Sequence, residues 1–144
     1  MEKPVIAVIN GPNLNLLGKR EPEVYGWQSF EEFFALLEME HPEAHLHHFQ
    51  SNIEGELIDE LHKYSENCHG IIFNPGGYSH TSVALADAIA AIKPPVVEVH
   101  ISNVHAREDY RQTLITASKC AGVITGLGLN GYRLALQYLL EYKK

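Results

Sequence analysis

Short β-branched segments alternate with helix-like segments along the whole chain, and this alternation is the feature that most restricts its fold. The pattern predicts strands at Val5–Ile9, Leu46–Phe49, Ile71–Phe73, Val96–Val99 and Val123–Thr125. Strand–helix alternation favours a parallel sheet with helices on both faces. Because the 144 residues contain no internal repeat and no linker, we expect a single domain over residues 1–144.

Each predicted strand is followed by a helix signal. Ser29 with Glu32, and Ser51 with Glu54, have the spacing of a capping box at the start of a helix. The other three helices are expected over about residues 81–92, 106–119 and 130–142. Pro94-Pro95 ends the first of these three, because proline cannot continue a helix. Five such units suit a flavodoxin-like, three-layer α/β fold with strand order 2-1-3-4-5.

The ends of the predicted strands indicate where a ligand would bind. In sheets of this kind, ligands lie beyond the carboxyl ends of the strands, near the point where the strand order reverses. Polar segments follow the first, third and fourth strands, at Asn10–Asn13, Asn74–Gly77 and Glu98–Asn103. The irregular stretch from Asn10 to Trp27 is longer than an ordinary connection, which favours a functional lid.

Composition excludes some classes of partner and compartment. The formal net charge of -7 and the lack of a Lys/Arg-rich run argue against nucleic acid, so an anionic substrate must meet a local cluster of arginines. Cys68 and Cys120 are too few for a disulfide framework and lack zinc-site spacing, which is typical of a reducing cytosol. We find no signal peptide and no membrane-spanning run, and we expect a cytoplasmic protein.

Arg20 and Tyr25 lie within the long stretch and suggest a base. A free phenol has a pKa of about 10, so a phenolate at neutral pH needs a shift of roughly two to three units. One guanidinium about 4 Å away, at an effective dielectric near 20, supplies on the order of 4 kcal/mol, or about three units. A single well-placed Arg20 is therefore sufficient to activate Tyr25. The alternative is a surface tyrosine beside an incidental arginine.

Glu98 and His100 suggest an acid. Residues two apart leave the same face of a strand, so the two side chains can act together. A carboxylate fixes the tautomer of an imidazole and favours its protonated form. The alternative is a purely structural ion pair.

The segment from Asn74 to His80 places two glycines and several hydrogen-bonding side chains before a helix, where the backbone can approach a ligand. The alternative is an ordinary strand–helix turn, since Asn, Pro and Gly are the usual turn residues.

Two further motifs carry less weight. His45 and His47 share one face of a strand without a third ligand at a recognisable spacing, so we expect no metal site there. The glycines of residues 126–131 match the dinucleotide-binding fingerprint, but no further strand with an acidic residue about 20 positions on follows them within these 144 residues. A glycine-rich turn is the better interpretation.

At this point the motifs resemble those of the type II 3-dehydroquinate dehydratase family. They are Gly11-Pro12-Asn13-Leu14-Asn15-Leu16-Leu17-Gly18, Arg20-Glu21-Pro22, Tyr25-Gly26, Gln50-Ser51-Asn52, Glu54-Gly55-Glu56, Asn74-Pro75-Gly76-Gly77-Tyr78 and Glu98-Val99-His100-Ile101-Ser102-Asn103. The resemblance runs in the right order from Val8 to about Leu136. It implies a flavodoxin-like fold, in agreement with the strand pattern.

The resemblance also implies a reaction, an anti elimination of water from 3-dehydroquinate through an enolate that gives 3-dehydroshikimate. Tyr25 removes the proton beside the ketone, Arg20 lowers the pKa of Tyr25, and Asn13 helps to hold a water at the enolate oxygen. His100, oriented by Glu98, protonates the departing hydroxyl. The same reaction belongs to aromatic amino acid biosynthesis by the shikimate pathway and to quinate catabolism, so it does not distinguish these two roles.

Substrate contacts carried over from the family are Asn74, His80, Asp87, Ile101, Ser102 and Arg111. Family members assemble as trimers grouped into dodecamers, so we expect Asp87 to reach the site of a neighbouring subunit. No cofactor and no metal are implied. The unrelated type I enzymes use a lysine Schiff base on a larger barrel, whereas Lys19 is the only lysine near the predicted site.

The chain departs from the family pattern at two places. Ile53 stands where many relatives have histidine, and Gln112–Leu114 is less polar than expected, but neither position has a catalytic role. A flavodoxin-like module for FMN or a nucleotide would need a Ser/Thr/Gly-rich phosphate loop after the first strand. The segment Gly11-Pro12-Asn13-Leu14 is not such a loop. A signalling receiver domain would need an aspartate at the end of the third strand, where this chain has Asn74.

Overall fold

A parallel sheet forms the centre of the molecule. The computed structural model describes residues 2–19, 21–25 and 27–142, with the backbone alone at 24 and 25. Within this part of the chain, the sheet has five strands in the order β2-β1-β3-β4-β5. The strands are β1 (Val5–Asn10), β2 (His45–Gln50), β3 (Gly70–Asn74), β4 (Val96–His100) and β5 (Gly122–Thr125). The predicted α/β class, parallel sheet and strand order are confirmed.

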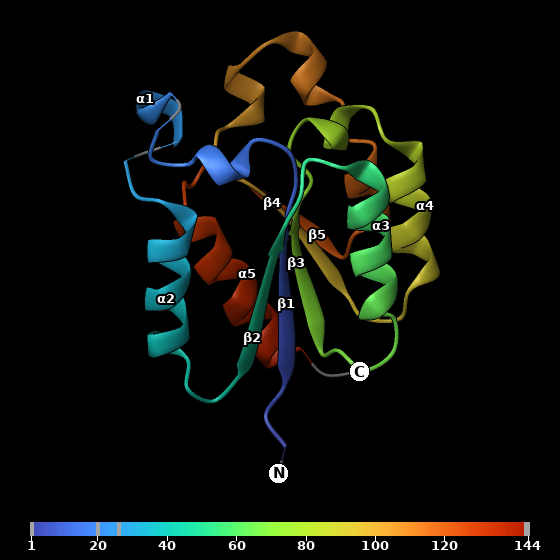
Figure 1. The fold of residues 1–144 in the computed structure, drawn as a ribbon. Helices are drawn as coiled ribbons and strands as arrows, with labels where there is room; N and C mark the ends of the chain where they lie inside the picture. The colour runs from blue at the N-terminus through green and yellow to red at the C-terminus, as the bar shows by residue number, and fades with distance from the viewer. Residues whose placement is uncertain (1, 20, 26, 143–144) are drawn as a thin grey trace.

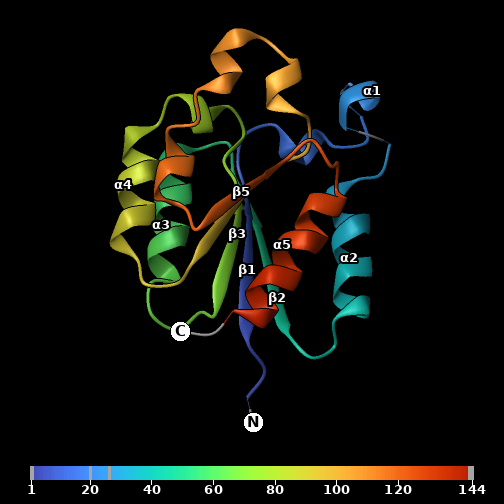
Figure 2. The ribbon, with the colours of Figure 1, turned by 180° about the vertical axis from the view of Figure 1, so that it is seen from behind.

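Helices cover both faces of the sheet (Figures 1 and 2). The helices α2 (Phe30–Glu40) and α5 (Asn130–Glu141) pack on one face, and α3 (Glu54–Lys63) and α4 (Val83–Ala91) on the other. Alternate side chains of β1 belong to the two cores, Ile6 and Val8 to the first and Ala7 and Ile9 to the second. The continuous apolar run of β1 therefore reflects burial on both faces, as expected of a central parallel strand.

One of the two predicted capping boxes is confirmed. At the start of α2, Ser29 Oγ accepts a hydrogen bond from the Glu32 backbone N–H at 3.2 Å, and the Glu32 carboxylate accepts one from the Ser29 N–H at 3.4 Å. The box predicted at Ser51 and Glu54 is wrong, because other groups occupy both side chains. Ser51 donates to Glu56 at 2.5 Å, and the Glu54 carboxylate accepts from the Ser82 hydroxyl at 2.5 Å.

The helix predicted over residues 106–119 is also wrong. The chain instead forms short 3-10 turns, η3 (Val104–Ala106), η4 (Asp109–Gln112) and η5 (Thr116–Lys119). The turns η3 and η4 lie beyond the carboxyl ends of the strands, whereas η5 packs beside α4 (Figures 1 and 2). Besides local bonds within these turns, the segment bonds to a distant turn: the Ile115 N–H donates to the Ser79 carbonyl at 2.7 Å, and the Thr113 carbonyl accepts from His80 Nδ1 at 2.9 Å. Tertiary contacts therefore replace the helical ladder.

The long stretch after β1 contains two short helical pieces, η1 (Leu14–Leu16) and α1 (Pro22–Tyr25). Leu14 and Leu17 are buried in the core beside α2, and they attach the start of the stretch to the body of the domain. None of the helices that the structure describes has the length and apolar character needed to cross a bilayer.

Candidate active site

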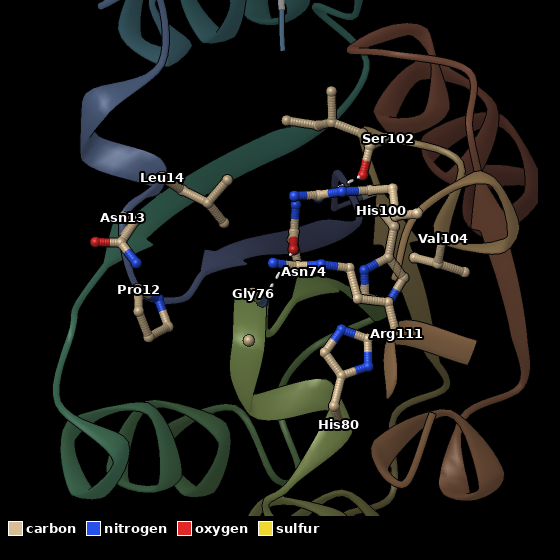
Figure 3. Close-up of a pocket in the computed structure, with 13 residues that line it drawn as sticks. Pro12, Asn13, Leu14, Asn74, Gly76, His80, His100, Ser102, Val104 and Arg111 are labelled. Atoms are coloured by element: carbon tan, nitrogen blue, oxygen red, sulfur yellow. Dashed lines mark hydrogen bonds between the residues drawn. The ribbon is translucent and has the colours of Figure 1, made fainter. Parts of the chain in front are cut away.

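A pocket opens at the carboxyl edge of the sheet, where the polar segments after β1, β3 and β4 meet (Figure 3). Asn10 of β1 is paired in register with Asn74 of β3, so the two strands end side by side. The pocket is lined by Pro12, Asn13, Leu14, Asn74, Gly76, Gly77, His80, His100, Ile101, Ser102, Val104, Arg107 and Arg111. The convergence that strand order 2-1-3-4-5 predicts at this edge is therefore present.

Glu98 and His100 form a buried pair in the wall of the pocket. They stand two residues apart on β4, and His100 Nε2 donates to a Glu98 carboxylate oxygen over 2.7 Å. Glu98 is 0% exposed and His100 is 6% exposed. The carboxylate holds the hydrogen of Nε2, so Nδ1 is the ring nitrogen through which His100 can meet a ligand.

A hydroxyl supports the far side of the Glu98 carboxylate. Thr116, which is fully buried in η5, donates to Glu98 Oε1 over 2.5 Å. The Cys120 thiol lies 3.9 Å from the same oxygen. Burial raises the pKa of this thiol, and the nearby charge of Glu98 raises it further. A buried carboxylate needs such donors, because burial without partners strongly disfavours its charge. The irregular 104–119 segment thus supplies a partner for the buried carboxylate of Glu98.

The opposite wall is a strained turn after β1. Asn13 has a left-handed backbone conformation with φ 71°, which asparagine adopts more readily than most residues. Its N–H donates to the Asn52 side chain over 3.0 Å. The turn also lies very close to the end of β3: a Cβ added to Gly11 would stand 2.4 Å from the Pro75 carbonyl oxygen. Only glycine at position 11 lets the two polar strand ends approach this closely.

Two arginines give the pocket a local positive charge within an acidic chain. Arg107 Nη1 donates to Ser102 Oγ over 3.0 Å, and Arg111 Nε donates to the Glu108 carboxylate over 2.6 Å. Both residues line the cavity. The local arginine cluster that an anionic substrate requires, given the net charge of -7, is therefore in place.

His80 faces His100 across the pocket, with ring centroids 6.2 Å apart. Its Nδ1–H donates to the Thr113 carbonyl over 2.9 Å. Burial lowers the pKa of His80, the charges of His100 and Arg111 act in the same direction, and the bond to Thr113 opposes them. A neutral His80 with its hydrogen on Nδ1 offers Nε2 as an acceptor to a hydroxyl group.

The loop after β4 is held in place from β5 and from the turn that follows β5. Thr125 Oγ1 donates to the Ser102 carbonyl over 3.0 Å, and the Gly128 N–H donates to the Ile101 carbonyl over 3.0 Å. Both carbonyls of this loop are thus occupied by donors from the neighbouring segment. The backbone at Ile101 and Ser102 is therefore fixed at the rim of the pocket before any ligand binds.

The structure brings most of the predicted site residues together. The residues that line the pocket are Asn13, Asn74, His80, His100, Ile101, Ser102 and Arg111, with Glu98 directly behind His100. Asp87 is exposed on α4 and does not line the pocket. Arg20 and the side chain of Tyr25 lie outside the described residues; the backbone of Tyr25 ends α1.

Sequence reasoning missed three residues that the structure joins to the site. Arg107 lines the pocket four residues before Arg111, and this pair of arginines directly after a polar strand end was a usable signal. Thr116 and Tyr132 reach the site only through the fold, since Thr116 bonds to a residue 18 positions away and Tyr132 to one 122 positions away. No local pattern marks these two side chains.

Comparison with known proteins gives one consistent answer. The profile of the family described as dehydroquinase class II matches residues 4–140. A 3-dehydroquinate dehydratase of Bacillus pumilus is 52% identical over 140 residues, covering 96% of this chain and 95% of the relative. One from Mycobacterium bovis is 48% identical over 144 residues, covering 99% and 98%. The crystal structure of type II dehydroquinase from Butyrivibrio crossotus superposes with a TM-score of 0.93 at 40% identity, covering 96% of this chain and 99% of that one.

Proposed function

Because this chain belongs to the class II dehydroquinase family, we propose that the pocket is where it removes water from 3-dehydroquinate, as a type II 3-dehydroquinate dehydratase. The enzyme is a hydro-lyase, and its product is 3-dehydroshikimate. The observation that carries the assignment to this pocket is the buried Glu98–His100 pair at the wall of a cavity lined by two arginines. This arrangement combines a proton donor with charges that attract an anionic substrate.

His100 is the general acid in this proposal. The elimination breaks a C–O bond, and the departing hydroxyl leaves as water once it takes a proton from the ring. Glu98 holds Nε2, so the donated proton comes from Nδ1 of the imidazolium. The carboxylate stabilises the positive charge of the ring before transfer, and Thr116 keeps the carboxylate in position.

Tyr25 is the general base. Its phenolate takes the proton from the carbon beside the ketone, and the electrons of the broken C–H bond form an enolate. Arg20 stabilises the phenolate, with an attraction on the order of 4 kcal/mol at about 4 Å. Support comes from the place of Asn13, which stands in the pocket wall at the start of the segment that carries Tyr25. Asn13 holds a water at the enolate oxygen in this scheme.

The remaining side chains bind the substrate. Arg111 attracts the anion, and the backbone of Ile101 and Ser102 provides fixed N–H groups for its carboxylate. His80 accepts a hydrogen bond from a ring hydroxyl through Nε2, and Asn74 binds a second oxygen. Together they fix the orientation of the ring, which an anti elimination requires because base and acid must act on opposite faces.

Assembly and location extend the proposal. Asp87 is exposed on α4, away from the pocket of its own chain, which is compatible with a contact to the site of a neighbouring subunit. We therefore propose trimers that assemble into a dodecamer. Cys68 and Cys120 are free thiols, which supports a cytoplasmic location because reduced cysteines are typical of that compartment.

The test is a direct assay. With 3-dehydroquinate added, the wild-type protein should generate the ultraviolet absorbance of a conjugated enone. Tyr25→Phe and His100→Ala should each lower kcat by about a thousand-fold, the range in which one general base or acid contributes. Full activity of the Tyr25→Phe variant would eliminate the proposed base, and absence of any signal from wild type would eliminate the function.

A further inference from the structure

A buried hydrogen-bonded network lies beneath the pocket, outside the catalytic groups. Tyr132 lies on α5 and is 0% exposed. Its hydroxyl reaches the ends of the two central strands: it donates to Asn10 Oδ1 over 2.7 Å and accepts from Asn74 Nδ2 over 3.0 Å. Asn10 is 0% exposed and Asn74 is 3% exposed, so water cannot replace these partners easily.

The direction of every hydrogen bond in the network follows from one backbone group. The Gly76 N–H can only donate, and it lies 3.1 Å from Asn74 Oδ1, so the oxygen of the Asn74 amide must face Gly76 (Figure 3). The nitrogen of that amide therefore faces Tyr132 and gives it one hydrogen. A phenol has a single hydrogen, which Tyr132 then gives to Asn10.

The same logic extends to the edge of the sheet. With its oxygen occupied by Tyr132, Asn10 directs Nδ2 at His48 Nε2, 3.2 Å away, and that nitrogen must accept. His48 packs against Phe30 and Phe34 of α2, with ring centroids 4.6 Å and 5.3 Å from its own. Burial lowers the pKa of His48, which agrees with a neutral ring that accepts. All five groups thus agree on one set of hydrogen positions.

From this network we infer that Tyr132 is a positioning residue: its hydroxyl holds the Asn74 amide so that the second Nδ2 hydrogen addresses an oxygen of the substrate. An amide nitrogen carries two hydrogens, and the one that Tyr132 does not take is available in the pocket that Asn74 lines. The site therefore selects a ligand that presents an oxygen acceptor, a hydroxyl or a carboxylate, to Asn74. The inference rests on the proposed function, because that oxygen belongs to the proposed substrate.

Tyr132→Phe tests the inference, since it removes one oxygen atom and keeps the buried ring. Without the hydroxyl, the Asn74 nitrogen loses its fixed partner. The KM for 3-dehydroquinate should rise about ten-fold, the loss expected when one buried hydrogen bond no longer holds its donor. The kcat should change less than about two-fold, because the acid and the base are untouched. Tyr138→Phe, a 48% exposed tyrosine on the same helix, is the matched control and should behave as wild type.

A double-mutant cycle with Asn74→Ala shows whether Tyr132 acts through Asn74. If it does, adding Tyr132→Phe to the Asn74→Ala variant leaves the KM unchanged. Asn10→Leu is an independent variant that keeps Tyr132, and it replaces Tyr132→Phe if that variant does not fold. It removes the acceptor of the Tyr132 hydroxyl hydrogen, so it should also raise the KM.

Three results overturn the inference: a wild-type KM in Tyr132→Phe, a ten-fold rise that persists in the Asn74→Ala background, or, where Tyr132→Phe does not fold, a wild-type KM in Asn10→Leu. If the first result comes with a fall in kcat, Tyr132 acts in the chemical step and not in positioning Asn74. An inactive wild-type protein is a different outcome, because it refutes the proposed function itself. The two failures are therefore distinguishable in one set of assays.

Discussion

The two walls of the pocket are built in different ways. On the β3 and β4 side, Asn74, Glu98 and His100 are at most 6% exposed. Tyr132 and Thr116, from distant segments, hold Asn74 and Glu98, and Glu98 in turn holds His100. On the other side, Asn13 is exposed and strained, and its N–H bonds to the exposed side chain of Asn52. The proposed acid thus belongs to the core, whereas the proposed base comes from the chain that continues beyond Asn13. The contrast teaches that the fold preorganises the proposed acid within the core, where the geometry depends on contacts between distant segments.

Among the residues that support His100 on the core wall, Glu98→Gln should have the largest effect. The amide keeps the size of the side chain but loses the charge that stabilises the protonated ring of His100. We expect kcat to fall about a hundred-fold with KM nearly unchanged, as measured by the enone absorbance. If kcat stays within a few-fold of wild type, the buried pair serves the fold alone and the contrast between the walls disappears.

Thr116→Val should cause a smaller loss of kcat on the same wall of the pocket. Valine fills the space of threonine but leaves Glu98 Oε1 without its hydroxyl donor. We expect kcat to fall about ten-fold, the worth of one hydrogen bond to a charged group. Thr116→Ser restores the hydroxyl and should recover most of the activity. Equal activities of the valine and serine variants would show that the hydroxyl does not position Glu98.

On the loop wall, Asn52→Ala removes the acceptor of the Asn13 N–H. This bond is exposed, so its loss is worth less than the loss of a buried one, and kcat should fall only about three-fold. Asn67→Ala, at another exposed asparagine far along the chain, is the control and should leave the rate unchanged. A loss as large as that of Glu98→Gln would contradict the ranking of the two walls.

The smallest effect concerns pH and stability. Burial lowers the pKa of His48 and of His80 in the folded protein, although the charge of Glu31 partly opposes the shift at His48. The unfolded chain therefore binds protons at about pH 6.5, before the folded chain does, so stability is full above that pH and declines as the pH falls below it.

Urea unfolding at about pH 7.5 and about pH 5.5 measures this decline. His48→Gln keeps an acceptor for Asn10 and should show a weaker dependence on pH than wild type. His45→Gln, on the exposed side of the same strand, should keep the wild-type dependence. A decline of the same size in His48→Gln and in wild type would remove His48 from the explanation.

What could be predicted from the sequence depended on how local its cause was. Alternation predicted the strands, and the spacing of Glu98 and His100 predicted the pair, because both follow from the geometry of neighbouring residues. The strand order was predicted only as the arrangement that suits five such units, and the structure confirms it. The Ser51 capping box and the 106–119 helix failed where local signals compete with partners far away in sequence, such as Ser82 for Glu54 and Ser79 for Ile115. Thr116 and Tyr132 carried no local signal at all.

The central claim is a division of labour, in which the loop removes the proton from carbon and the core donates a proton to the leaving hydroxyl. Deuterium exchange tests it directly: 3-dehydroquinate is incubated with each variant in D₂O, recovered, and examined for deuterium at the carbon beside the ketone, against an enzyme-free control. His100→Ala should exchange that hydrogen while failing to release water, because Tyr25 still forms the enolate. Tyr25→Phe should do neither. Exchange by Tyr25→Phe, or none above the control by His100→Ala, would contradict the account.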